Sequence, residues 1–228
     1  MKGKEDEFMN PGPKIMGHLF GIESLPISDT LIVSWVVVVA LIIIGKIIGS
    51  NVELIPGKIQ NGTEMLITAI EGQIEPMLPG EGRKFLPFMA TLFIFVGVSN
   101  LVGVLPKVPN PTGDINTTLG LALVVFILMH IEGVRENGLW GYLKGFAEPV
   151  IILLPINIVS EFAKPISHSF RLFGNIVGGG IIITLLYQAA PWLIPIPIQL
   201  WFDLFIGVIQ ALIFGMVAIA YISVAKDG

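Results

Sequence analysis

The sequence predicts an all-α polytopic membrane protein, a single domain over residues 1–228 with about five membrane-embedded helices and one helix at the interface. Hydrophobic residues make up 54% of the chain and charged residues only 13%, about half of the roughly 25% usual in soluble domains. This composition excludes an ordinary soluble domain, a nucleic-acid binder and a disordered chain. The absence of cysteine excludes disulfides, thiol catalysis and cysteine-ligated metals.

The first two segments are an outer N-terminal tail, residues 1–30, and a first span, residues 31–50. The tail is polar and contains acids, so it does not have the pattern of a signal peptide. The apolar run Leu31–Gly49 has the roughly 20 residues that cross a bilayer. Lys46, near the end of this run, can extend its ammonium group toward the lipid headgroups.

Residues 51–84 predict a cytoplasmic segment with a helix that lies at the membrane interface. Apolar residues follow helical spacing there, but acids interrupt them, so the segment is too polar to span. Residues 85–134 contain the second and third spans, Phe85–Leu105 and Thr117–Ile131, separated by a proline-rich turn. A short charged loop is expected after the third span.

Residues 150–225 predict a long, tilted hairpin of two antiparallel helices. Val150–Ala190 is mostly apolar, and about 40 helical residues would extend roughly 60 Å, twice the thickness of the roughly 30 Å hydrocarbon core. The helix must therefore tilt or break, and Pro155 and Pro165 permit a kink. The last apolar run, Ile198–Ala225, follows an uncharged turn and crosses the membrane again.

Basic residues in the loops predict the orientation, because short loops rich in lysine and arginine stay in the cytoplasm. Five crossings place the two termini on opposite sides of the membrane. One side receives the larger set of basic residues, which is Lys58, Arg83, Lys84, Arg135, Lys144 and Lys226. The N-terminus is therefore expected outside and the C-terminus in the cytoplasm.

Arg171 lies deep in an apolar segment. An arginine at the centre of a bilayer costs about 2.5–3.5 kcal/mol on insertion scales, so it is a candidate functional residue. A structural ion pair, with Glu161 or Asp203, is the alternative. Steps of three or four residues place one polar stripe along the helix, formed by Lys164, His168, Arg171, Asn175 and Gly178. Such a stripe must face protein or water rather than lipid.

The last helix carries a matching polar face, formed by Asp203, Gly207 and Gln210. An antiparallel pairing would bring Gln210 within one or two turns of Arg171. It would also place Asp203 nearer the outer turn, close to Gly180. A cation and an amide near the middle, with an acid toward the outside, fit ion passage up to a charged barrier better than they fit a binding pocket.

The segment KPISHSFRLFGNIVGG resembles the signature of subunit a of the F-type rotary ATP synthase. The family pattern is a basic residue, proline, an aliphatic residue and serine, followed a few residues later by Arg-Leu-Phe-Gly-Asn. Here these positions are Lys164–Ser167 and Arg171–Asn175. The last helix, IQALIFGMVAIAYIS, is similar to the C-terminal helix of the family, with Gln210 at its glutamine position. The stretch PNPTGDINTTLGLAL is similar to the outer loop of the family, and the resemblance extends over most of the chain from about Leu31.

The resemblance implies an ion-translocating stator subunit in a bacterial cell membrane, beside a ring of c subunits that each carry one carboxylate. H⁺ or Na⁺ would reach that carboxylate through an outer half-channel and leave through an inner one. Arg171 would ionise the arriving carboxylate and block direct leakage, and Asn175, Asp203 and Gln210 would take part in translocation. Peripheral-stalk b subunits and the rest of the F1Fo complex would be further partners. No catalytic residue, metal or cofactor is implied, because ATP chemistry would lie on other subunits.

Two positions depart from the family pattern. The family often has a facing acid and histidine in the outer half-channel, whereas this chain has Asp203 and the side-chain-free Gly180. His168 replaces a residue that is aliphatic in many members; it would either line a polar path or, as we expect, bond a backbone carbonyl. Glu161 is either an inner half-channel acid or the partner of Lys164. His130 and Glu132, near the end of a span, are expected at the interface.

Three other functions are weighed against this one. A secondary transporter or channel with its own substrate site would need an inverted repeat or broken helices at the midplane, and neither is visible. A membrane anchor without an ion path would leave the facing polar stripes unexplained. An enzyme is disfavoured, because the sequence has no nucleophile–base pair, metal cluster or phosphate-binding glycine loop.

Overall fold

The computed structural model describes residues 14–18, 26–50, 52–105, 108–148, 150–189 and 195–227, without the side chains of residues 26, 189, 195, 196, 203 and 227. Within this part, five helical segments are long and apolar enough to cross a membrane: Asp29–Ser50, Gly82–Val102, Ile115–Gly145, Ile151–Gln188 and Pro197–Lys226. The predicted all-α polytopic fold is therefore confirmed.

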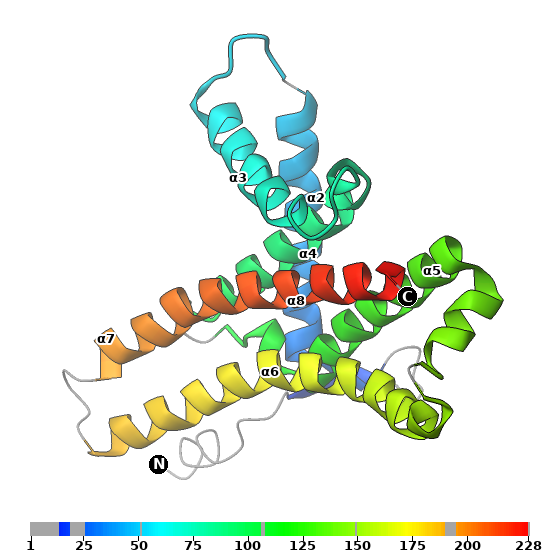
Figure 1. The fold of residues 1–228 in the computed structure, drawn as a ribbon. Coiled ribbons are helices and arrows are strands. Elements are labelled where there is room, and N and C mark those ends of the chain that lie inside the picture. Colours follow the sequence, from blue (N-terminus) through cyan, green and yellow to red (C-terminus); the bar gives the residue numbers. More distant parts are fainter. Residues whose placement is uncertain are drawn as a thin grey trace.

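The long helices follow one another along the chain (Figure 1). They are α2 (Asp29–Ser50), α3 (Lys58–Ile74), α4 (Gly82–Val102), α5 (Ile115–Gly145) and α6 (Leu154–Ala189). The last segment is continuous and consists of α7 (Pro195–Leu200), the π-helical η4 (Trp201–Ile206) and α8 (Gly207–Asp227). Short elements precede α2, α5 and α6, namely the antiparallel pair β1 (Ile15–His18) and β2 (Pro26–Ser28), η2 (Pro111–Gly113) and η3 (Ile151–Leu153).

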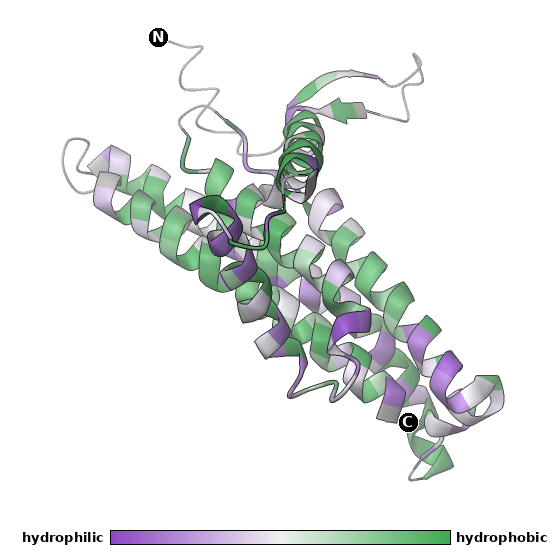
Figure 2. Ribbon diagram, turned by 90° about the horizontal axis from the view of Figure 1, so that it is seen from above, coloured by the Kyte–Doolittle hydropathy of each residue, from purple (hydrophilic) through white to green (hydrophobic). Residues whose placement is uncertain are grey.

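Helix α2 crosses the layer that α5, α6 and α8 form. Figure 1 shows α2 running across these helices, and Figure 2 shows it nearly end-on while they extend across the view. Most of the side chains of α2 face outward, as the exposed Val36, Ile42 and Ile47 illustrate. The 36 residues of α6 extend about 54 Å at 1.5 Å per residue, which exceeds the bilayer core. Tilt of α6 and α8 in the membrane stays a prediction.

The apolar core lies between α4, α5 and α8. Met89, Val96, Met129, Phe214 and Ile222 are all fully buried there. One side of α8 comes so close to α4 that a Cβ added at Gly215 would overlap the ring of Phe93. The glycine therefore permits a contact that any larger residue would prevent.

Helix α5 is longer than the sequence predicted. A charged loop was expected after Ile131, but the helix continues to Asn137, and after a break at Gly138, where φ is +69°, a second helical stretch runs to Gly145. The charge of Glu132 does not end the helix, because this carboxylate is 3% exposed and paired with Lys84 and Arg135. Helix α3 runs within the segment expected at the interface, and only Ile70 and Ile74 of it are buried.

Candidate functional site

Helices α6 and α8, with α7 and η4, form the candidate site. Their contacts step along the two segments in opposite directions. The contacting pairs are Tyr187 with Gln199, Gly179 with Phe202, Asn175 with Gln210, His168 with Phe214, and Lys164 with Tyr221. The two segments therefore run antiparallel, and the polar stripe of α6 lies along the edge of this contact.

Arg171 is half-buried and forms no hydrogen bond or ion pair with any residue that the structure describes. Glu161, one of the two partners considered for a structural pair, bonds Lys164 instead. The side chain of Asp203, the other one, lies outside the described residues. The guanidinium has five N–H donors and stays charged at all accessible pH values, so it is available to an anion from outside the chain.

The surface beside Arg171 is bare backbone. A Cβ added at Gly174 or Gly178 would meet no atom within 4 Å, and helical spacing places both glycines near the face of Arg171. Gly179, on another face, differs because its Cβ would lie 2.9 Å from the ring of Phe202. The face of α6 that carries Arg171 can therefore accept a closely packed helix.

An amide pair lies one turn from Arg171. The Nδ2 of Asn175 donates a hydrogen bond to Oε1 of Gln210 at 2.6 Å. Gln210 is 2% exposed, and its Nε2 has no partner among the described residues. A buried donor without a partner costs about 1–3 kcal/mol, so Nε2 is available for a polar group that comes to Arg171. The predicted proximity of Gln210 and Arg171 agrees with this geometry.

A cavity of about 170 Å³ lies at the Lys164 end of the polar stripe of α6. It is lined mainly by α5, α6 and the end of α8, and its polar lining residues are Tyr142, Asn157, Ser160, Glu161 and Lys164. Lys164 bonds Oε1 of Glu161, while the buried Oε2 has no partner within the described part of the chain. The expected pairing of Glu161 with Lys164 is present, and Glu161 also borders this cavity, whereas its role as an inner half-channel acid stays a prediction.

His168 is 1% exposed and lies between two aromatic rings of α8. Its ring stacks on Phe214 at 3.8 Å between centroids and meets the edge of Tyr221 at 5.7 Å. Neither ring nitrogen has a hydrogen-bond partner in the described residues. The expectation that His168 bonds a backbone carbonyl is therefore wrong, because stacking on Phe214 fixes its ring instead.

The other end of the stripe, away from the cavity at Glu161, is open around Gly180, where an added Cβ would meet no atom within 4 Å. Sequence reasoning did not identify the buried polar contacts that hold this end together. Asn100 donates to the carbonyl of Gly207 at 2.8 Å and accepts a hydrogen bond from Thr112 at 2.6 Å. A lone asparagine inside an apolar run was the available signal, because such a group needs a partner in the membrane.

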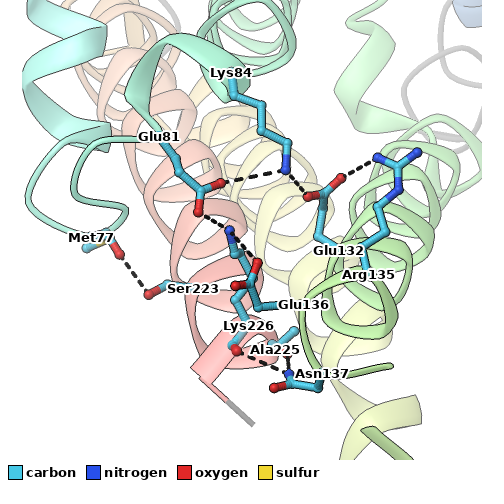
Figure 3. A network of polar contacts seen from close by, with 10 residues as sticks. All are labelled: Met77, Glu81, Lys84, Glu132, Arg135, Glu136, Asn137, Ser223, Ala225 and Lys226. Carbon is cyan, nitrogen blue, oxygen red and sulfur yellow. Dashed lines mark hydrogen bonds and ion pairs between the residues drawn. The ribbon is translucent and has the colours of Figure 1, made fainter. Parts of the chain in front are cut away.

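The C-terminal end of α8 is held by an ionic clamp, which consists of Glu81, Lys84, Glu132, Arg135, Glu136 and Lys226 (Figure 3). The carboxylate of Glu132 forms ion pairs with Lys84 and Arg135, while the buried Lys226 pairs with Glu81 and Glu136. The hydrogen bond from Lys226 lowers the pKa of the Glu81 carboxyl, and the charges of Lys226 and Lys84 add to this effect against the opposing effect of burial. The sequence could not reveal the clamp, since its members come from three separate segments.

Comparisons with known proteins give a consistent result. Residues 31–223 match a family model described as the ATP synthase A chain. The chain is 40% identical to ATP synthase subunit a 2 of Bradyrhizobium sp., over 95% of this chain and 97% of the relative. It is 36% identical to a sodium ion specific ATP synthase subunit a of Propionigenium modestum, over 95% and 80%. It is also 36% identical to ATP synthase subunit a of Moorella thermoacetica, over 90% and 94%.

Proposed function

Because the chain belongs to the ATP synthase A chain family, we propose that it forms two half-channels through which H⁺ or Na⁺ reaches and leaves the rotating c-ring. The family is subunit a, a membrane subunit of the Fo sector with a stator role and no catalysis of its own. The partners are the c-ring, the peripheral-stalk b subunits and the remainder of the F1Fo complex.

The observation that carries the proposal is Arg171 itself, which has no hydrogen-bond or ion-pair partner among the described residues. It lies on a face of α6 where a Cβ added at Gly174 or Gly178 would meet no atom within 4 Å. A ring helix can approach this face closely enough for its carboxylate to meet the guanidinium. An opposite charge within about 4–6 Å favours the ionised carboxylate, so the bound ion is released. Asn175 and the free Nε2 of Gln210 provide polar groups beside the ionised carboxylate.

Arg171 also acts as the barrier between the two half-channels. Its charge is permanent, so it repels a cation that would pass directly from one side to the other. A cation must then travel on the ring, and the ring must turn. A membrane potential contributes about 2.3 kcal/mol per charge per 100 mV to this rotation.

The two half-channels lie on opposite sides of Arg171. Asp203 and the open space at Gly180 form the outer one, and the cavity at Glu161 forms the inner one. In the inner cavity, the Oε2 of Glu161, which has no hydrogen-bond partner in the described part of the chain, can receive an ion beside Lys164. His168 lies between the inner cavity and the level of Arg171.

The ionic clamp supports the proposed orientation in the cell membrane. Lys84, Arg135 and Lys226 come from three helices and meet in the clamp, on one side of the molecule. All three belong to the set of basic residues expected in the cytoplasm, which supports a cytoplasmic C-terminus and an outer N-terminus.

The transported ion is H⁺ or Na⁺. A relative from Propionigenium modestum is named as sodium ion specific, and the oxygen-rich inner cavity is compatible with both ions. Pumping by the purified complex in vesicles distinguishes them. Sodium transport requires uptake that depends on Na⁺ and continues in the presence of a protonophore, whereas a protonophore abolishes the gradient of a proton pump.

Single-cysteine variants test the two half-channels, because the chain has no cysteine of its own. In sealed vesicles of known orientation, Gly180→Cys and Asp203→Cys should react with small aqueous thiol reagents from the outer side. Glu161→Cys should react from the inner side. Leu172→Cys is the matched control, since Leu172 is fully buried and should stay unreactive. Reaction of all these positions from one side, or of none, would refute the arrangement.

A further inference from the structure

The seam between α6 and α8 contains three aromatic rings in contact that the proposed mechanism does not use. His168 of α6 stacks on Phe214 of α8 at 3.8 Å, and its edge meets Tyr221 at 5.7 Å. The Nζ of Lys164 lies 5.7 Å from the ring of Tyr221, on the side of the inner cavity. The rings therefore lie between the inner cavity and the level of Arg171.

The seam is closed around these rings. Phe214 and His168 are 0% and 1% exposed. The residues that surround them are also buried, namely Pro165, Ser169 and Leu172 on α6 and Ala211 and Ala218 on α8. On the side of α5, the hydroxyls of Ser169 and Thr118 are 3.0 Å apart and share a hydrogen bond. No polar channel can pass through a layer of this kind without displacing a ring.

The seam is open or polar on both sides of this layer. The cavity of about 170 Å³ lies below it, with Glu161 and Lys164 in its wall. Above it come the pair of Asn175 and Gln210 and the open space at Gly180. An ion that crossed the layer would pass from the inner to the outer side within this one subunit, behind Arg171 and without the ring.

A proton relay through His168 does not fit these contacts. A relay needs a donor and an acceptor at hydrogen-bond distance on the two sides of the imidazole. Both ring nitrogens are buried and have no such partner in the described part of the chain. The surroundings of the ring are two aromatic side chains and the cations Lys164 and Arg171, one turn away on either side.

We propose that His168, Phe214 and Tyr221 form an aromatic seal that stops ions from leaking along the α6–α8 seam. The inference rests on the proposed function, because a seal is needed only where two half-channels meet the same pair of helices. Arg171 blocks the route along the ring face, and the aromatic seal blocks the second route through the subunit. Both must hold for the ion gradient to be coupled to rotation.

Passive ion leak tests the seal. The intact complex is reconstituted in vesicles without nucleotide, so that the rotor is held, and ion influx is followed after a potential is applied. His168→Ala and Phe214→Ala should each raise the leak severalfold, because each leaves a void beside polar groups that water can enter. His168→Phe refills the space with an apolar ring and should remain as tight as the wild type.

Met129→Ala is the matched control, since Met129 is equally buried but belongs to α5, which contributes no ring to the seal. It should lower stability without raising the leak. The proposed seal would be overturned if complexes with His168→Ala and Phe214→Ala leaked no more ions than the wild type. It would also be overturned if His168→Phe or Met129→Ala raised the ion leak as much as those two variants. ATP-driven uptake by the wild-type complex tests the proposed function separately, so failure of the seal and failure of the ion path give different results.

Discussion

Two adjacent glycines of α6 should respond in opposite ways to the same substitution. Gly178→Ala places its Cβ where no atom lies within 4 Å, whereas Gly179→Ala places its Cβ 2.9 Å from Cδ1 of Phe202. The second variant must push α6 and η4 apart by about 0.5 Å, and overpacking of this kind costs about 1–3 kcal/mol. The first variant has no such cost and gains up to about 1 kcal/mol, because alanine favours a helix over glycine.

Thermal stability of the purified complex measures this difference. The midpoint for release of subunit a should be unchanged or higher with Gly178→Ala and lower with Gly179→Ala. The helix preference of alanine is common to both variants, so the gap between them is the overpacking cost of about 1–3 kcal/mol. Equal loss of stability in both variants would refute the assignment of an open and a packed face to α6.

A larger side chain at the open face tests its function. Gly178→Leu should leave the packing within the chain unchanged but obstruct a ring helix that approaches Arg171. ATP-driven ion uptake should therefore fall strongly with Gly178→Leu and much less with Gly178→Ala. Full uptake with the leucine variant would show that this face does not contact the ring.

Three further predictions concern the ends of the path and the clamp. Glu161→Gln should slow ATP-driven ion uptake by about tenfold or more, because the inner cavity loses the carboxylate that receives the ion, and an unchanged rate would exclude this role. Asp203→Asn should lower the rate of ion-driven ATP synthesis without uncoupling, since the barrier at Arg171 remains; uncoupled ATP hydrolysis in this variant would contradict it. The pKa of Glu81 is lowered by Lys226, so the stability from this pair is present above the unfolded pKa and is lost as pH falls through the lower folded pKa. The thermal midpoint of the complex should therefore fall in acid, below about pH 4, and Glu81→Gln should remove part of that dependence; an identical pH profile would refute the pairing.

The sequence was sufficient to predict those features of the fold that the membrane itself imposes. Long apolar runs predicted five spans, because a backbone in lipid must satisfy its hydrogen bonds within a helix. The same reasoning kept the polar stripe of Arg171 and Asn175 away from lipid, facing protein or water, and the antiparallel pairing brought Gln210 near Arg171. Position along a helix did not give the hydrogen bond between Asn175 and Gln210, which only the structure shows.

The remaining features depend on contacts between distant segments. Helix α5 continues through its charged residues because Lys84, from another helix, neutralises Glu132. His168 has no hydrogen-bond partner among the described residues, and its ring stacks on Phe214, which nothing in the local sequence indicates. Composition near each residue could not reveal either partner.

Replacement of Arg171 tests the central claim most directly. Purified complexes with Arg171→Ala, Arg171→Lys and the control Arg83→Ala are reconstituted in vesicles, and ATP synthesis driven by an imposed ion gradient is measured. Arg171→Ala should assemble but make no ATP, and Arg171→Lys should not restore the full rate, because a point charge does not replace a planar guanidinium. Arg83→Ala, which removes an exposed arginine at the start of α4, should work normally. ATP synthesis at the normal rate by either Arg171 variant would contradict the account.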